Sequence, residues 1–104
     1  MRRAAVVQYQ TNADSAEQNL NLIEDVLIEL AARDPGGLDY QVFQFEDGVG
    51  FLHFAVFDGT SDPFADCGAH REFHRNLQQR LTTPPIISRA VLIGSYFGSR
   101  CGDA

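Results

Sequence analysis

Residues 38–57 constrain the fold most strongly, because they contain two strand-forming runs that leave no face for water. The runs are Leu38–Glu46 and Val49–Phe57, and Asp47-Gly48 separates them. An Asp-Gly pair between two such runs predicts a β-hairpin with a type I′ turn, which requires a positive φ at both central residues.

Both faces of each predicted strand are apolar. The first run places Tyr40 and Val42 against Phe43 and Phe45, and the second places Phe51, Ala55 and Phe57 against Leu52, Phe54 and Val56. An antiparallel sheet with one solvated face alternates apolar and polar residues instead. We therefore expect both faces of this sheet to be covered.

A strand and a helix precede the hairpin. Residues Arg3–Gln10 predict the strand, and Ser15-Ala16-Glu17-Gln18 fits a capping box at the start of the helix. The residues Asp34-Pro35-Gly36-Gly37 end the helix, because Pro lacks an N–H donor and Gly permits a left-handed turn. The apolar stripe of this helix comprises Leu20, Ile23, Val26, Leu27, Leu30 and Ala31.

A second helix and a last strand follow the hairpin. The helix is predicted to begin between Asp66 and Ala69 and to run to about Leu81, before Thr82-Thr83-Pro84-Pro85. The strand is predicted over Ile86–Phe97, because Ile, Val and Tyr favour strands. We expect one domain over residues 1–104, with a core at about 4–97 and a flexible tail at 98–104.

The element order is strand, helix, strand, strand, helix, strand. This βαββαβ order predicts an α+β, ferredoxin-like fold, with a four-stranded antiparallel sheet and both helices on one face. Two helices cover only one sheet face. The second apolar face therefore predicts a homodimer through the sheet face.

Composition excludes several classes of function. Eight basic residues against fourteen acidic ones give a net charge of −6, which argues against nucleic acid or an anionic membrane as the main partner. All the basic residues are Arg, so Schiff-base, pyridoxal phosphate and P-loop lysine chemistry are absent. No apolar run is long enough for a membrane span. Cys67 and Cys101 lie in no CxxC pair, and we expect a cytoplasmic protein with two free thiols.

The hairpin and the last strand carry a family resemblance. The pattern Leu38-x-Tyr40-x-x-Phe43-x-Phe45-x-Asp47-Gly48-x-x-Phe51-x-His53, with the closing Gly94-Ser95-Tyr96, resembles the antibiotic biosynthesis monooxygenase-like group of the dimeric α+β barrel superfamily over about residues 4–97. The resemblance implies a sheet-to-sheet dimer and a small-molecule pocket between sheet and helices. It also implies oxygenation without a cofactor for some members. The lack of Trp argues against the haem-degrading branch, which uses one.

The three histidines are the predicted catalytic residues. His70 and His74 lie four residues apart, so a helix places them on one face. The dipole of a helix that starts near Asp66 favours a neutral His70, the form that a general base requires. His53 shares a strand face with Phe51, and this face points either to the helices or to the partner copy. Two histidines supply too few ligands for zinc, and we expect no metal.

Three further residues are predicted to bind the substrate, namely Tyr9, Tyr40 and Phe73. Tyr96 also has a phenol to offer, although aromatic residues on strands usually belong to the core. The side chains of Arg71, Glu72, Arg75 and Arg80 are predicted to form a solvated helix face.

The sequence leaves three functions open. The first is binding of an aromatic or polyketide-like molecule with oxidation that needs no cofactor. The second is a ligand-binding or sensor module without chemistry, and the third is a polyketide cyclase. Fold resemblance does not separate them.

Overall fold

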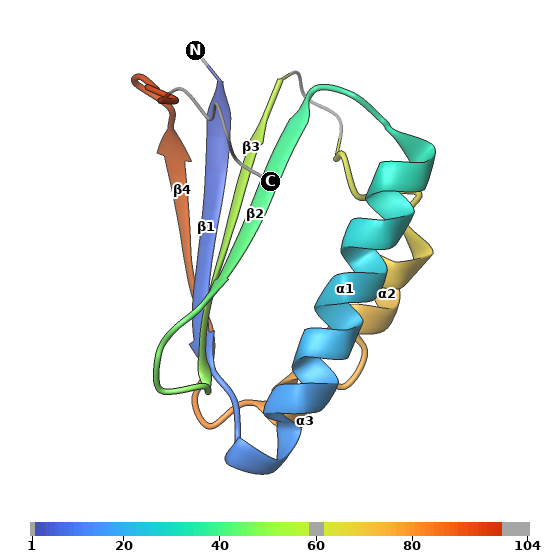
Figure 1. The fold of residues 1–104 in the computed structure, drawn as a ribbon, viewed down its shortest axis with the longest axis vertical. Coiled ribbons are helices and arrows are strands. Elements are labelled where there is room, and N and C mark those ends of the chain that lie inside the picture. The colour runs from blue at the N-terminus through green and yellow to red at the C-terminus, as the bar shows by residue number, and fades with distance from the viewer. Residues whose placement is uncertain (1, 59–61, 99–104) are drawn as a thin grey trace.

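The computed structural model describes residues 2–58 and 62–98 and has the expected α+β, ferredoxin-like architecture (Figure 1). All neighbouring strands are antiparallel, in the order β2-β3-β1-β4. The elements are β1 (Arg3–Gln10), the 3-10 turn η1 (Ala13–Ser15), α1 (Ala16–Arg33), β2 (Leu38–Gln44), β3 (Gly50–Phe57), α2 (Gly68–His74), α3 (Leu77–Arg80) and β4 (Ile86–Val91).

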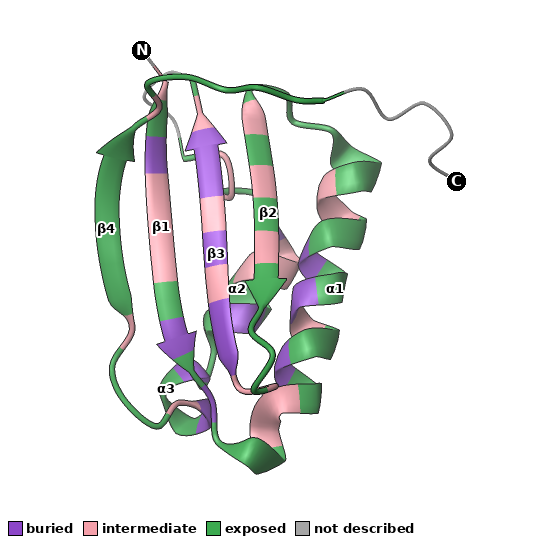
Figure 2. Cartoon of the chain, turned by 60° about the vertical axis from the view of Figure 1, so that its left-hand side comes forward, coloured by how far each residue is buried: buried purple, intermediate pink, exposed green. Residues whose placement is uncertain are grey.

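The helices cover one face of the sheet, and the core lies between them (Figures 1 and 2). Val26 and Phe51 are almost fully buried there, and they hold α1 against β3. None of the described helices covers the opposite face, and this face carries Phe43, which is 48% exposed. Among the described residues, the buried members of the core cluster are Tyr9, Ile23, Val26, Phe51, Cys67, Phe73 and Leu77.

The start of α1 differs from the predicted capping box. Ser15 makes no side-chain capping bond, and its own backbone is already close to helical (φ −102°, ψ −6°). Its N–H donates to the carbonyl oxygen of Asn12, so the 3-10 turn replaces the capping box. The predicted end is confirmed: Asp34 takes a left-handed conformation (φ 46°), and Gly36 and Gly37 also have positive φ.

The apolar stripe of α1 is rotated from its predicted position. Asn19, Ile23 and Val26 are its buried residues, whereas Leu20 and Leu27 are 37% and 40% exposed. Leu20 and Leu27 instead border a groove beside β2. The helix is rotated because Asn19 is hydrogen bonded to Tyr9 and Arg80 inside the core, which places the Asn19 side of α1 against the sheet.

The hairpin is confirmed, but its turn is not type I′. Gly48 has a positive φ of 81°, and Asp47 does not. The Gly48 N–H donates to the carbonyl oxygen of Phe45, and the Asp47 carboxylate accepts from the N–H groups of Val49 and Gly50. The Asp47 side chain thus stabilises a wider loop that needs only one left-handed residue.

The predicted second helix is broken into two. Asn76 is left-handed (φ 61°) and separates α2 from α3. Arg80, predicted to be solvated, is only 4% exposed, and its guanidinium donates to the carbonyl oxygens of Phe73 and Arg75 near the break. The break therefore stands because Asn tolerates this conformation and a buried cation satisfies the carbonyls.

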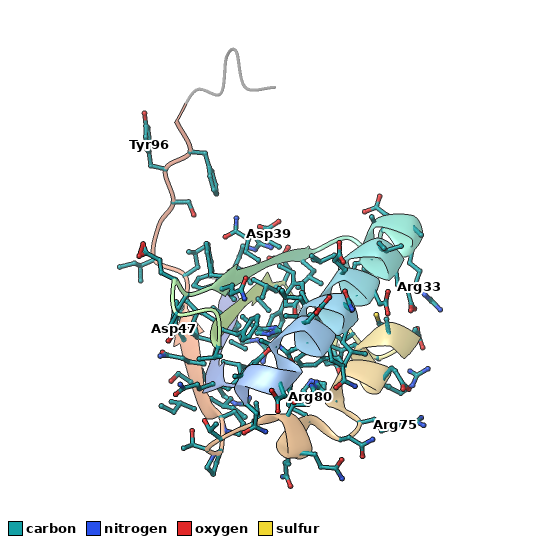
Figure 3. All side chains as sticks on the ribbon, turned by 60° about the horizontal axis from the view of Figure 1, so that its bottom comes forward. Arg33, Asp39, Asp47, Arg75, Arg80 and Tyr96 are labelled. Carbon is teal, nitrogen blue, oxygen red and sulfur yellow. The ribbon has the colours of Figure 1, made fainter. Side chains whose placement is uncertain are left out.

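The last strand is shorter than predicted. It ends at Val91, whose partner Arg3 is the first residue of β1, and one more backbone hydrogen bond follows, from the Leu92 N–H to the carbonyl oxygen of Arg2. After it, Ile93 and Tyr96 are 94% and 90% exposed, and Tyr96 points away from the sheet (Figure 3). The predicted flexible tail and Cys101 lie outside the described residues, apart from Gly98. None of the helices described is both long and apolar enough to cross a membrane.

Candidate functional site

A cavity of about 170 Å³ lies between the sheet and α2 and gathers the predicted site residues. Small apolar side chains of β1 and β3 form its floor, and the aromatic and imidazole rings form its wall. All six residues predicted to carry or bind a substrate line it. The lining consists of Ala5, Val7, Tyr9, Tyr40, His53, Ala55, Phe64, His70, Phe73, His74 and Leu77.

His53 is held at the cavity floor by two phenols. The β3 face that carries it turns toward the helices, because its neighbour Phe51 packs against the core. The Nε2 atom of His53 lies 2.6 Å from the hydroxyl of Tyr9, and its Nδ1 atom lies 2.7 Å from the hydroxyl of Tyr40. Both ring nitrogens of His53 are therefore hydrogen bonded within the protein.

His70 and His74 form a second imidazole group, on α2. Their Nε2 atoms are 3.3 Å apart, and the His70 ring stacks on Phe64 at a centroid distance of 4.2 Å. His70 is half-buried, whereas solvent reaches His74. Phe64 lies in the loop before α2, and sequence patterns did not indicate its role.

The three imidazoles are neutral at neutral pH. Burial, with smaller contributions from the nearby His74 and His70, lowers the pKa of His53 to about 4. Burial also lowers the pKa of His70 to about 4, with a smaller contribution from His74, and it lowers the pKa of His74. His70 does lie in the first turn of α2, but burial rather than the helix dipole is the main cause of its neutral state.

The phenols remain protonated. Burial raises the pKa of Tyr9 to about 12, although the hydrogen bond from Asn19 and the charge of Arg80 partly oppose it. Burial also raises the pKa of Tyr40. Both hydroxyls are consequently available as hydrogen-bond donors.

Two residues that sequence reasoning missed support this site from behind. Asn19 is fully buried on α1, and its Nδ2 atom donates to the Tyr9 hydroxyl at 2.9 Å. Arg80 donates through Nε to the Asn19 Oδ1 atom at 3.2 Å. An Asn on the predicted apolar side of a helix, one position from the stripe, was the available signal for this role.

The start of α2 depends on a residue of α1. The Glu29 carboxylate accepts the N–H groups of Gly68 and Ala69, at 3.0 and 2.9 Å. These bonds, that of Ala69 first, hold the pKa of Glu29 below its usual value. Cys67, which precedes α2, makes no such capping bond. Glu29 therefore positions the turn that carries His70.

Other candidates lie elsewhere. Tyr96 does not line the cavity and is almost fully exposed, and Cys67 is a buried free thiol that does not line it either. Within residues 2–58 and 62–98, no three His, Cys, Asp or Glu side chains are grouped so that they could hold a metal ion.

Comparison with solved structures supports the same fold. Over 91% of its length the chain matches 98% of Rv0793 from Mycobacterium tuberculosis (TM-score 0.75, 12% identity). It also matches a Nitrosomonas europaea protein provisionally assigned as an antibiotic biosynthesis monooxygenase (TM-score 0.73, 10% identity, 88% of this chain and 99% of that one).

A third similar structure holds a ligand. This is a monooxygenase from the gene ActVA-Orf6 of Streptomyces coelicolor in complex with nanaomycin D (TM-score 0.64, 17% identity, 94% of this chain and 93% of that one). No family model and no curated protein matches the sequence. The likeness therefore concerns the backbone, and the chain has the fold of the antibiotic biosynthesis monooxygenase-like proteins.

Proposed function

We propose that the cavity binds an aromatic, polyketide-like molecule and that the protein oxidises it without a cofactor. The observation that carries this proposal is the meeting of His53, His70 and His74 on one largely apolar cavity. The similar S. coelicolor monooxygenase was solved with nanaomycin D, which favours a ligand of this class.

The proposed reaction starts with a proton transfer from carbon. His70 takes a proton from a methylene group that two aromatic rings and a conjugated carbonyl make acidic, and His74 accepts a hydrogen bond from the resulting imidazolium. The carbanion transfers one electron to O2, the carbon radical and superoxide combine as a peroxide anion, and this anion takes the proton back from the His70 imidazolium to give a hydroperoxide. Loss of water then converts the carbon to a carbonyl: one oxygen atom enters the product, and the other leaves in water.

The protein contributes orientation and exclusion of water. Phe73 is 4% exposed and Phe64 stacks on His70, so an aromatic ligand meets flat apolar walls. The lining is mostly apolar, and a charge that develops there is poorly screened. Neutral imidazoles are the available bases, because the cavity lining includes neither a carboxylate nor a Lys.

The proposal includes a cytoplasmic homodimer. Its support is the sheet face without helices, where Phe43 is 48% exposed and Leu52 and Phe54 are half-buried. A second copy of the same face would cover these side chains around a two-fold axis. The cavity lies on the other side of the sheet, so each protomer would keep its own site.

Oxygen uptake with anthrone tests the proposed oxidation. We expect one O2 consumed and one anthraquinone formed for each anthrone, and we expect His70→Gln to lower the rate at least about tenfold. The control is Arg75→Gln, because Arg75 is exposed and points outward in Figure 3. Anthrone that binds and is recovered unchanged would contradict oxidation and favour a ligand-binding module.

A further inference from the structure

The hydroxyl of Tyr40 and the buried side chains behind it form one connected hydrogen-bond chain. It runs from Arg80 through Asn19, Tyr9 and His53 to Tyr40. Most of these groups can either donate or accept, so the direction of each bond decides what the last hydroxyl offers to a ligand.

Arg80 sets the direction of the hydrogen bonds at the start of this hydrogen-bond chain. A guanidinium only donates, so the atom of Asn19 that faces Arg80 is its oxygen. The amide nitrogen of Asn19 then faces Tyr9, 2.9 Å from the phenol oxygen. Tyr9 therefore accepts from Asn19, and its own hydrogen must go elsewhere.

The Tyr9 hydrogen has one destination among the described residues, the Nε2 atom of His53 at 2.6 Å. Tyr9 is 5% exposed, and a buried hydroxyl hydrogen without an acceptor costs about 1–3 kcal/mol. Nε2 of His53 therefore accepts, and the neutral ring carries its proton on Nδ1. This proton is donated to the Tyr40 oxygen at 2.7 Å.

Tyr40 then has a hydrogen that no atom of residues 2–58 and 62–98 accepts. A phenol oxygen has one lone-pair direction and one O–H direction in the plane of its ring, and His53 occupies the first. Tyr40 lines the cavity, and within the described part of the chain its oxygen has no second hydrogen-bond partner. The O–H group is consequently left to donate to a bound ligand.

We propose that Arg80 and Asn19, acting through Tyr9 and His53, fix the Tyr40 hydroxyl as a donor, so that the site selects ligands that place a carbonyl or phenolate oxygen beside it. Tyr40 is the specificity-determining residue, and Asn19 and Arg80 are positioning residues. The inference rests on the proposed function only for the identity of the cavity as the ligand site. In the proposed oxidation, this donor would stabilise the negative charge that the carbonyl oxygen gains when carbon loses its proton.

The isosteric substitution Asn19→Asp tests this proposal, because it would reverse the direction of every hydrogen bond that follows the one from Arg80. The carboxylate of this variant would accept from both Arg80 and the Tyr9 hydroxyl. Tyr9 would then accept from Nε2–H of His53, and the Tyr40 hydroxyl would donate to Nδ1 and offer only a lone pair to the ligand. The new carboxylate is paired with the buried Arg80, which favours retention of the fold.

The experiment makes two measurements on the protein of 104 residues. Long-range ¹⁵N NMR at neutral pH reports the His53 tautomer, and we expect Nδ1–H in the wild type and Nε2–H in Asn19→Asp. Binding of α-tetralone, which only accepts, is compared with that of 1-naphthol, which also donates. We expect Asn19→Asp to shift the ratio of their two Kd values about tenfold in favour of 1-naphthol.

An Nε2–H tautomer in the wild type, or an unchanged Kd ratio in a variant whose tautomer has changed, would overturn the proposal. Neither readout involves oxygen. A protein with the expected tautomers and ratio that consumed no oxygen with anthrone would contradict the oxidation and leave the Tyr40 assignment intact. Oxygen uptake with the opposite tautomer would do the reverse.

Discussion

His70 and His74 place their Nε2 atoms 3.3 Å apart, on successive turns of α2. A hydrogen bond at this distance has room for one proton between the two nitrogens, so the pair resists a second proton. Phe64 stacks on the His70 ring and Phe73 packs against the His74 ring, so the pair is partly shielded, although solvent still reaches His74. Proximity and burial together make these imidazoles neutral bases rather than cations.

The first prediction concerns stability and pH. His53 and His70 have pKa values of about 4 in the folded protein, against 6.5 for an exposed histidine. Below pH 6.5 the unfolded chain binds more protons than the folded one, so stability falls from pH 6.5 toward pH 4. For His53, which is 8% exposed, the loss by pH 4 is on the order of 3 kcal/mol.

Urea unfolding between pH 8 and pH 4.5 measures this loss. The variant His53→Gln keeps two polar atoms for the phenols but does not titrate, so its stability is expected to vary less over this range. Carboxyl groups act mainly below it. Equal slopes for the wild type and the variant would show that His53 is not held neutral.

The second prediction concerns Arg80. Its guanidinium satisfies the carbonyl oxygens of Phe73 and Arg75 and the amide oxygen of Asn19. Arg80→Met removes all these donors from buried acceptors, and we expect a loss of about 2–4 kcal/mol in the free energy of unfolding. Arg75→Met is the matched control, since Arg75 forms an exposed pair with Glu72 and its loss is expected to stay within about 0.5 kcal/mol.

The third prediction concerns the start of α2. Glu29→Ala removes the acceptor of the Gly68 and Ala69 N–H groups. We expect faster hydrogen exchange at these two amides. We also expect a higher Kd for a ligand of the cavity, because His70 directly follows Ala69. Glu24→Ala, on the exposed surface of α1, provides the comparison. Unchanged protection of both amides in Glu29→Ala would show that other contacts hold this turn.

The fourth prediction concerns the proposed dimer. Phe54→Asp introduces a charge on the sheet face without helices, and we expect the Kd for dimerisation to rise at least about a hundredfold, or about 3 kcal/mol. Ile28→Asp is the control, because Ile28 is 66% exposed on α1. Sedimentation equilibrium measures both variants. A wild-type chain that stays monomeric at high concentration would refute the proposed interface.

Local patterns in the sequence were sufficient for the elements and their order. Contacts between near neighbours in the chain determine three of these features. They are the apolar periodicity of α1, its end at Asp34-Pro35-Gly36-Gly37 and the Asp-Gly hairpin. The predictions from these patterns were wrong only in local details. The turn at Asp47 depended on a side-chain bond to Val49 and Gly50, and the break at Asn76 depended on Arg80, which no periodicity reveals.

The candidate site could be predicted from the sequence only in part. Spacing on a helix brought His70 and His74 together, because residues four apart share a face. Spacing could not decide which face of β3 meets the helices, so the position of His53 stayed open. Asn19 and Phe64 were missed, since their partners are distant in sequence or lie across a loop.

The sequence by itself thus determined the α+β order, the two-sided apolar sheet and the identity of the groups that can carry chemistry, since these follow from composition and short-range periodicity. Tertiary structure decided which of these groups meet. It turned His53 toward α2, buried Arg80 and aligned Asn19 with Tyr9, a residue on another element. Burial in a dry core is what lowers the histidine pKa values and gives each hydrogen bond one direction, and burial is a property of the packed chain rather than of any segment of it.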